Sequence, residues 1–191
     1  MESKKRCEWV TLSDPLYLEY HDNEWGTIEH SDKKLFESLI FQGFQAGLSW
    51  KTILYKRKNF IIAYDYFDPV KISQFNNQKV NELLQNRGII KNKLKIIASV
   101  ENAKAFLKIQ KEFGSFDEYI WKFVNYKTIQ NAWDNVKQIP SMSNESNAMS
   151  KDLYKRGFRF VGPTICYAYM QANGMVNDHT TTCYRHGELA E

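Results

Sequence analysis

The sequence predicts an all-α fold, and three observations support this prediction. Apolar residues recur at the three- and four-residue spacing of buried helix faces, helix-capping residues precede several of these runs, and strand signals are poor. The chain has 191 residues, of which 43% are hydrophobic, so it can bury a core. We therefore expect one domain over residues 1–191, without an apolar run long enough for a membrane span.

In the first third of the chain, three helix starts are expected. Ser31 and Asp32 can cap a helix whose apolar residues follow at helical spacing. A second helical run begins after Trp50. The pair Asp68 and Pro69 is typical of a cap followed by proline at the first helical position.

The middle of the chain predicts two helices joined by a tight turn. The first starts near Asn77 and stops at Gly88. The second runs from about Asn92 to Phe113, where Gly114 closes it.

The last third continues the helical pattern after a loop. Ser115 with Glu118 has the pattern of a capping box. Residues 138–150 are rich in Ser and Asn and are expected to form a surface loop, followed by a helix that stops at Gly157. The last clear helix opens at Pro163.

Basic residues are concentrated in one stretch of a nearly balanced sequence. The net charge is only +4, but residues 87–111 hold one acidic residue, Glu101, against seven basic ones. The basic residues are Arg87, Lys91, Lys93, Lys95, Lys104, Lys108 and Lys111. A basic patch on a near-neutral protein indicates a surface for a polyanion, although a solvated helix face is the alternative.

The predicted turn at Gly88 has the features of a phosphate site. Glycine permits the positive φ that a junction between two helices often requires. Backbone N–H groups of the turn can hold a phosphate oxygen, and Lys91, Lys93 and Lys95 would add positive charge beside it. This arrangement resembles the helix-hairpin-helix module of DNA-repair proteins, but glycine is also common in purely structural helix junctions.

Four metal-capable residues lie near the two ends of the chain. Cys7 and His21 are close to the start, and His179 and Cys183 are four residues apart. If the stretch from His179 to Cys183 is helical, these two side chains share one face of the helix. Two Cys and two His can form a closed, structural zinc site that ties the ends together, although spacing this loose is weak support by itself. The remaining cysteine, Cys166, is expected to be a core thiol. An odd cysteine count without a signal peptide predicts a reducing, cytoplasmic setting.

Aromatic residues crowd the first fifty positions. Tyr17, Tyr20 and Trp25 alternate with polar residues and do not form a clean core stripe. Rings in such a place can sandwich a nucleobase, and a cationic base would gain further from cation–π attraction. Ordinary core packing is the alternative interpretation.

Longer blocks of sequence identify a family that unites these signals. The blocks are RCEWV, DPLYLEYHDNEWG, KLFESLIFQGFQAGLSW, FDPVKI, GIIKNKLKI, KFVN, YKRGFRFVGPTICYAYMQANG and VNDH. Through them the chain closely resembles, nearly end to end, the bacterial 3-methyladenine DNA glycosylase I family of the helix-hairpin-helix glycosylase superfamily.

The resemblance implies an all-α helix-hairpin-helix DNA glycosylase fold in which a zinc site joins the N- and C-terminal segments. One structural Zn²⁺ per chain would be held by Cys7, His21, His179 and Cys183. The fold would comprise a helix-hairpin-helix lobe over roughly 68–136 and a zinc-anchored lobe over roughly 1–67 and 137–191.

The same resemblance assigns roles around a base pocket. Trp50 matches the ring that stacks on the flipped base, and Tyr20 matches a tyrosine that contacts it. Further aromatic residues around the pocket match Trp9, Tyr17 and Trp25. The loop that wedges into the space left by the base matches Gly47 and Leu48. The hairpin that grips DNA matches Gly88, Ile89 and Ile90, with Lys91 and Lys93 beside it.

One position departs from the family pattern. The family's pocket carries a glutamate that reads the edge of the methylated adenine, and the matching residue here is Gln42. An amide oxygen can still accept from an exocyclic amino group, but a neutral amide attracts a cation far more weakly than a carboxylate does. Natural variation, altered specificity and an introduced substitution all remain open as explanations.

The sequence therefore predicts a DNA-repair glycosylase that flips 3-methyladenine out of double-stranded alkylated DNA and hydrolyses its N-glycosidic bond. We expect free 3-methyladenine as product and no lyase step, because no lysine is marked as a nucleophile. A catalytically impaired or non-catalytic alkylation-damage binding protein is the alternative, because of Gln42. We further expect a monomer in the cytoplasm, associated with the nucleoid and not with a membrane.

Overall fold

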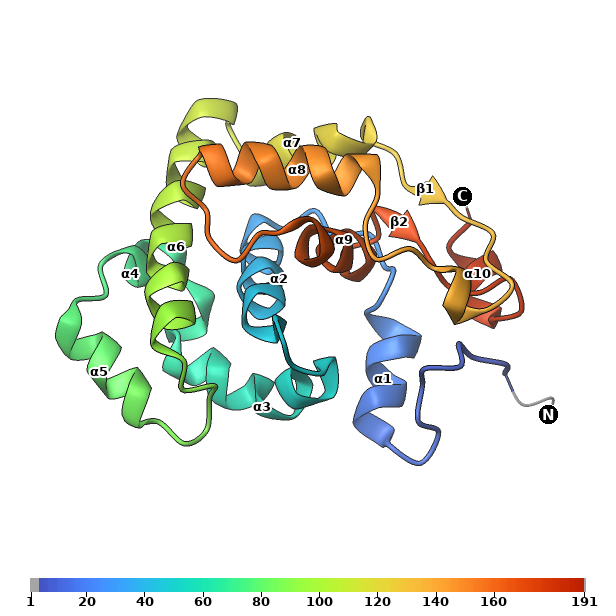
Figure 1. The fold of residues 1–191 in the computed structure, drawn as a ribbon, viewed down its shortest axis with the longest axis horizontal. Coiled ribbons are helices and arrows are strands. Elements are labelled where there is room, and N and C mark those ends of the chain that lie inside the picture. Colours follow the sequence, from blue (N-terminus) through green and yellow to red (C-terminus); the bar gives the residue numbers. More distant parts are fainter. Residues whose placement is uncertain (1–3, 191) are drawn as a thin grey trace.

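Helices make up most of the fold (Figure 1). The computed structural model describes residues 4–190. Within this part the helices are α1 (Pro15–Asn23), α2 (Asp32–Gln45), α3 (Trp50–Ala63), α4 (Pro69–Ser73), α5 (Asn77–Gln85), α6 (Lys93–Phe113), α7 (Phe116–Trp121), α8 (Asn144–Lys155), α9 (Pro163–Ala172) and α10 (Tyr184–Glu188). Short 3-10 turns lie at Asp65–Phe67, Lys122–Val124 and Val136–Gln138. The prediction of a helical fold is confirmed.

Two very short strands were not expected from the sequence. β1 (Ile129–Gln130) pairs in parallel with β2 (Val176–Asn177). The pair joins the connection after α7 to the segment after α9. His179 follows two residues after β2. Strands of this length have no periodicity that a sequence can reveal.

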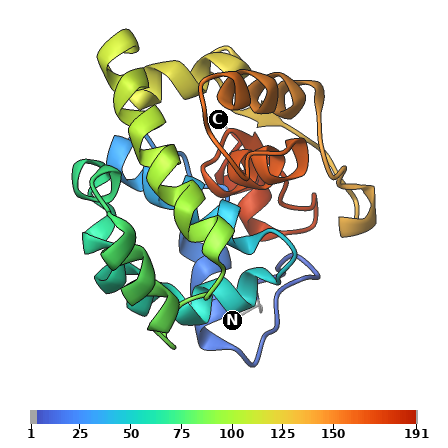
Figure 2. The same cartoon turned by 60° about the vertical axis from the view of Figure 1, so that its left-hand side comes forward.

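Helix α2 lies at the centre of the fold. It packs against α3, α6, α7 and α9, and Figure 1 shows it between α6 and α9, while Figure 2 turns α6 to the front. Its inward face carries Leu35, Phe36, Leu39 and Ile40, all buried as their spacing predicts. The same helix carries Gln42, so the central core element also reaches the candidate site.

Several predicted helix boundaries are confirmed by their caps. The Asp68 carboxylate accepts the N–H of Val70 at 2.9 Å, where α4 begins. Asn92 caps α6 through the N–H of Lys95, and Gly114 ends that helix with a φ of 88°.

The prediction that Asp32 caps its own helix is wrong. Ser31 occupies the N-cap position of α2 without a side-chain hydrogen bond. The Asp32 carboxylate instead accepts the N–H groups of Phe116 and Asp117, at 2.9 and 2.8 Å. It thus caps α7, an element far away in sequence, which a local pattern cannot show.

The prediction of a loop over 138–150 is also wrong in its second half. Helix α8 already begins at Asn144, because Ser143 and Ser146 form a reciprocal capping box. The Ser143 hydroxyl accepts the N–H of Ser146 at 3.2 Å, and the Ser146 hydroxyl accepts the N–H of Ser143 at 2.8 Å. Serine-rich sequence was therefore a helix start and not a loop.

The N-terminal segment lies beside the C-terminal helix. The N–H of Tyr184, at the start of α10, donates to the carbonyl oxygen of Lys5 at 2.9 Å. Arg6 forms a side-chain ion pair with Asp22 on α1 at 2.7 Å. Over residues 4–190, no helix combines the length and apolar character needed to cross a membrane.

Candidate functional site

Four buried side chains from the two ends of the chain converge on one point. Cys7, His21, His179 and Cys183 each offer one ligand atom, and these atoms all lie within 4.8 Å of one another. The Cys183 Sγ lies 3.5 Å from both His21 Nε2 and His179 Nδ1, and Cys7 Sγ lies 3.4 Å from His179 Nδ1. Metal–ligand bonds of about 2.0–2.3 Å in a tetrahedron would separate neighbouring ligand atoms by about 3.3–3.8 Å. The cluster therefore fits a tetrahedral metal ion.

The outer nitrogens of both histidines are already occupied. His21 Nδ1 lies 2.8 Å from the Asp22 carboxylate, and His179 Nε2 lies 3.0 Å from the carbonyl oxygen of Trp25. These bonds fix the ring orientations and leave His21 Nε2 and His179 Nδ1 facing the cluster, as the second ring nitrogen of a metal-bound histidine usually requires.

The charges around the cluster suit metal binding. Burial raises the pKa of the Asp22 carboxyl, but the hydrogen bonds from Arg6 and His21 outweigh it and hold that pKa below its usual range. Hydrogen bonds from Cys7 and the two histidines lower the pKa of Cys183, which favours the thiolate. Thiolate sulfur and imidazole nitrogen are ligands that zinc accepts.

The stretch from His179 to Cys183 is not helical. Residues 179–183 form a turn and not a helix, and α10 begins only at Tyr184. The two side chains still meet because the turn folds Cys183 back, with its N–H donating to the carbonyl oxygen of Thr180 at 2.8 Å. The third cysteine, Cys166, is buried and its thiol donates to the Val161 carbonyl oxygen, as expected for a core thiol.

Beside this cluster lies a slot with aromatic walls and a volume of about 140 Å³. Its lining comprises Trp9, Tyr17, Tyr20, Trp25, Gln42, Gln45, Trp50, Ala168 and Gln171. The ring centroids of Tyr20 and Trp50 are 5.0 Å apart, with the planes tilted by 39°. The structure thus brings all five of the aromatic residues singled out in the sequence to one cavity.

The slot and the cluster share a wall of rings. Trp9 contacts His21 edge-on, with ring centroids 5.2 Å apart, and Trp25 contacts His179 at 4.6 Å. Trp9 and Trp25 also contact each other at 5.1 Å. Because the histidine rings are held by the cluster, they orient Trp9 and Trp25, two of the tryptophans that line the slot.

Two buried polar atoms at the slot lack partners. Gln42 is only 2% exposed, and its Oε1 makes no hydrogen bond among the described residues. The Trp50 Nε1 is likewise buried and unpaired. Buried polar atoms are nearly always paired, so an acceptor and a donor left open in one cavity indicate a place for a ligand. Burial raises the pKa of the Tyr20 phenol, which keeps its hydroxyl neutral and able to donate.

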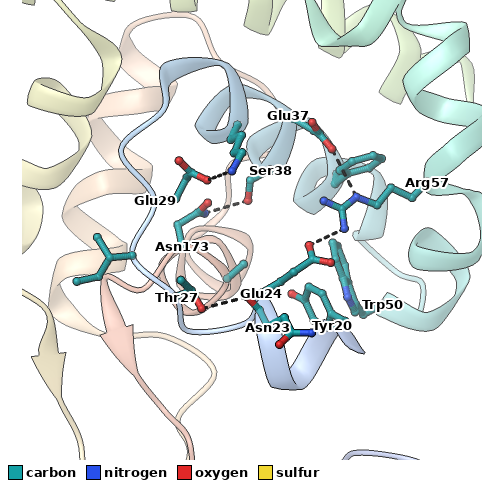
Figure 3. Close-up of a pocket in the computed structure, with 14 residues that line it drawn as sticks. Tyr20, Asn23, Glu24, Thr27, Glu29, Glu37, Ser38, Trp50, Arg57 and Asn173 are labelled. Carbon is teal, nitrogen blue, oxygen red and sulfur yellow. Dashed lines mark hydrogen bonds and ion pairs between the residues drawn. The ribbon is translucent and has the colours of Figure 1, made fainter. Parts of the chain in front are cut away.

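A larger recess of about 500 Å³ shares Tyr20 and Trp50 with the slot (Figure 3). Arg57 forms ion pairs there with Glu24 and Glu37, and burial raises the pKa of the Glu37 carboxyl. No motif in the sequence predicted this network. Helical spacing contains a signal for it, because Glu24 follows Tyr20 by one helical turn and Arg57 follows Trp50 by two.

The loop between α2 and α3 stands at the slot. Gly47 has a φ of 77°, a conformation that favours glycine, and the next residue, Leu48, is 41% exposed. The N–H of Leu48 donates to the carbonyl oxygen of Gln45 at 2.7 Å, and Ser49 caps α3. An apolar side chain is therefore presented to solvent on a short, hydrogen-bonded turn.

The turn between α5 and α6 departs from the expectation for Gly88. Glycines with positive φ occur elsewhere in the described chain, but Gly88 is not among them. A Cβ at Gly88 would lie 2.9 Å from the Cβ of Asn59 on α3, so glycine is needed for close approach. Its N–H is also occupied, since it donates to the Asn86 side chain at 2.8 Å.

The remaining backbone of this hairpin is open. The N–H groups of Ile89, Ile90 and Lys91 donate no hydrogen bond within residues 4–190, so they are available to an anion. The Ile89 side chain is buried and anchors the turn. Lys56 on α3, which no sequence motif indicated, donates to the Arg87 carbonyl oxygen at 3.2 Å and so places a further ammonium at the hairpin.

The predicted basic patch is only partly a surface. Lys91 and Lys93 are exposed, but Lys95 is 7% exposed and turns inward. Lys104 pairs with Glu101 at 2.9 Å. At a rise of about 1.5 Å per residue, Lys108 lies roughly 20 Å along α6 from the hairpin, so the far half of the helix is not part of this region.

Comparisons with known proteins agree on one family. A model of the methyladenine glycosylase family matches residues 9–186. DNA-3-methyladenine glycosylase 1 of Escherichia coli is 46% identical over 179 residues, covering 94% of this chain and 95% of the relative. DNA-3-methyladenine glycosylase of Haemophilus influenzae is 44% identical over 178 residues, covering 93% and 96%.

Solved structures give the same result. A crystal structure of 3-methyladenine DNA glycosylase I superposes with a TM-score of 0.92 at 46% identity, covering 94% of this chain and 98% of the other. A glutamate-to-glutamine mutant of the Staphylococcus aureus enzyme superposes with a TM-score of 0.89 at 34% identity, covering 94% and 96%.

Proposed function

Because the chain belongs to the methyladenine glycosylase family, we propose that it is a base-excision repair enzyme that hydrolyses the N-glycosidic bond of 3-methyladenine in alkylated DNA. One observation supports this function above all: the slot lined by Tyr20, Trp50 and Gln42 holds a buried acceptor and a buried donor without partners. A flipped purine would supply both missing partners and stack on the aromatic rings that line the slot.

The residues of the slot have distinct roles in this proposal. Trp50 stacks on the extruded base and Tyr20 contacts it, a contribution of about 1–3 kcal/mol for each stacked ring. The Gln42 amide oxygen accepts from the exocyclic amino group, and its NH₂ group can donate to a ring nitrogen. Trp9, Tyr17 and Trp25 complete the aromatic enclosure, which favours a cationic base.

Two neighbouring elements hold the double-stranded DNA. Leu48, presented by Gly47, enters the gap that the flipped base leaves in the duplex. The free N–H groups of Ile89, Ile90 and Lys91 bind a phosphate, with the ammonium groups of Lys56 and Lys93 nearby. Of the hairpin residues predicted to grip DNA, Gly88 contributes by allowing the close approach to α3.

The chemistry needs little acid or base help from the protein. Methylation makes the adenine a cationic leaving group, so the N-glycosidic bond breaks with its electron pair going to the base. Water then bonds to the sugar carbon and releases a proton to solvent. The slot is lined by no carboxylate and no lysine, which supports hydrolysis without a strong general base and without a Schiff-base lyase step. The DNA phosphates stabilise the developing sugar cation.

The metal site is structural in this proposal. Cys7, His21, His179 and Cys183 fit one Zn²⁺ per chain, since two thiolates and two imidazoles complete a tetrahedron and leave no open position for water. When bound, zinc supplies cross-linking of the two chain ends and no chemistry at the base. The His21 and His179 rings contact Trp9 and Trp25, and so orient these two rings of the slot.

The wider setting follows from the same function. We propose a monomer with a hairpin lobe over roughly residues 68–136 and a metal-anchored lobe formed by the rest. A DNA-repair role and three buried cysteines that form no disulfide favour the reducing compartment that holds the chromosome. A non-catalytic damage-binding role is not favoured, because the relatives reported above are named as glycosylases.

Release of free base tests this proposal. Methylated duplex DNA is incubated with the protein, and the soluble bases are separated by chromatography. The proposal predicts 3-methyladenine in solution and abasic sites in the DNA, without a borohydride-trapped adduct. Tight binding to methylated duplex without any released base would contradict it and support the damage-binding alternative.

A further inference from the structure

Lys95 is the one basic residue of the hairpin helix α6 whose charge turns into the protein. It is 7% exposed, and its ammonium donates to the carbonyl oxygen of Phe44 at 2.8 Å and to that of Ala46. No acidic side chain within residues 4–190 forms an ion pair with it, and the ring of Phe160 lies 5.9 Å away. Burying an ammonium group costs free energy unless its N–H groups donate hydrogen bonds. The two carbonyl oxygens supply these hydrogen bonds and so stabilise the buried charge.

The position of Lys95 is unfavourable for its own helix and favourable for another. It is the third residue of α6, where the helix dipole repels a cation, and the first turn of α6 contains no acidic residue. The carbonyls that it binds belong to the C-terminal end of α2, where carbonyl groups lack helical partners and a cation is stabilised. Lys95 therefore destabilises the start of α6 slightly and stabilises the C-terminal end of α2.

The segment that Lys95 holds, residues 44–46, lies between Gln42 of the slot and the loop that carries Leu48. Phe44 follows Gln42 on α2, and Ala46 directly precedes Gly47 and Leu48. The same α6 begins where the free N–H groups of the hairpin end. We propose, on the basis of the function proposed above, that Lys95 is a positioning residue that couples the phosphate-binding hairpin to the loop carrying Leu48.

This coupling explains how binding of a DNA phosphate at the hairpin can position the Leu48 side chain. A phosphate bound at the hairpin fixes the start of α6, and the Lys95 ammonium carries that position to the carbonyls just before Gly47. The loop is then held at a defined distance from the DNA strand whose phosphate is bound. A displacement of about 1 Å in a positioning group can reduce a rate by about a hundredfold. The two hydrogen bonds of Lys95 can therefore affect the rate of base release.

Lys95→Met tests the proposal, because methionine keeps the length and buries well but cannot donate. Lys108→Met, on the exposed face of the far half of α6, is the matched control. The first measurement is hydrogen exchange of the Leu48 amide, which donates to Gln45 in the ordered loop. We expect exchange about tenfold faster or more in Lys95→Met and unchanged exchange in Lys108→Met. Unchanged Leu48 exchange in Lys95→Met would overturn the proposal.

A double-mutant cycle with Leu48→Ala is the second measurement. Under single turnover, Lys95→Met should reduce base release about 10- to 100-fold, with duplex affinity changed by less than about threefold. In the Leu48→Ala background the same substitution should have almost no further effect, because the coupled group is gone. Fully additive effects would show a general structural role and contradict the proposal. If the unsubstituted protein releases no base, the proposed function fails, and the Leu48 exchange still decides on the role of Lys95.

Discussion

The metal cluster and the aromatic slot share a wall of rings but leave their polar atoms in opposite states. In the cluster, the outer nitrogens of His21 and His179 are paired and the inner ligand atoms face one another. In the slot, Gln42 Oε1 and Trp50 Nε1 are buried without partners. The first region is complete once the chain folds around an ion, whereas the second becomes complete only with a ligand. The comparison separates what stabilises this protein from what it binds.

The largest expected effect is on the cluster side. Cys183→Ser should lower the free energy of unfolding by about 3 kcal/mol or more, because a thiolate ligand is lost and the two chain ends are no longer joined. Urea unfolding and metal analysis of the purified protein measure this. Cys166→Ala, which changes a buried thiol outside the cluster, should keep the metal and lose less stability. Equal metal content in the Cys183 variant would contradict the assignment of the cluster.

The next largest effect is on the slot side. Trp50→Ala should reduce base release about 5- to 150-fold, which corresponds to the loss of about 1–3 kcal/mol of stacking. Binding to undamaged duplex should change little, since the hairpin contacts remain. Tyr154→Ala, which removes an exposed ring on α8 outside the slot, should leave release unchanged. An equal loss of release and of undamaged-duplex binding in Trp50→Ala would place Trp50 on the DNA surface and not in a base slot.

Gln42→Glu places a negative charge at the unpaired acceptor of the slot and so tests whether this atom binds the cationic base. A charge-assisted hydrogen bond exceeds a neutral one by about 1 kcal/mol, so base release should rise about fivefold at neutral pH. Single-turnover rates measure this, and Gln45→Glu, on the same slot, is the control for a general charge effect. No gain in Gln42→Glu would show that the amide suits the substrate of this chain.

The smallest effect concerns the hairpin. Lys91→Ala and Lys93→Ala should each reduce the slope of log affinity against log salt by about 1, equally for damaged and undamaged duplex. Fluorescence anisotropy at several salt concentrations measures the slope. Lys155→Ala on α8 serves as the control for net charge. An unchanged slope in both hairpin variants would move the phosphate contacts to another surface.

Most of the fold could be predicted from sequence because its signals are local. The caps at Asp68 and Asn92 act within three residues, and the buried face of α2 follows helical spacing. The failures concern partners distant in sequence. Asp32 caps α7 instead of its own helix, and Gly88 is required by its approach to Asn59.

The candidate site shows the same division. Family blocks such as YHDNEWG and QAGLSW pointed to the residues that the structure gathers around the slot and the cluster. They could not show that Gln42 Oε1 is unpaired or that Lys95 turns inward, because both depend on which helices meet. The Arg57 network was missed for the same reason, since one of its carboxylates, Glu24, follows the end of α1 and the other, Glu37, lies on α2.

An NMR titration of the protein with free 3-methyladenine tests the central claim most directly. With ¹⁵N-labelled tryptophan, the indole N–H of Trp50 should shift in a saturable way, because the base occupies the cavity where that donor is unpaired. The indole signals of Trp121 and Trp133, whose N–H groups already donate to Glu29 and Asp178, should stay in place. An unmoved Trp50 signal at saturating base would show that the base does not occupy the slot lined by Tyr20 and Trp50.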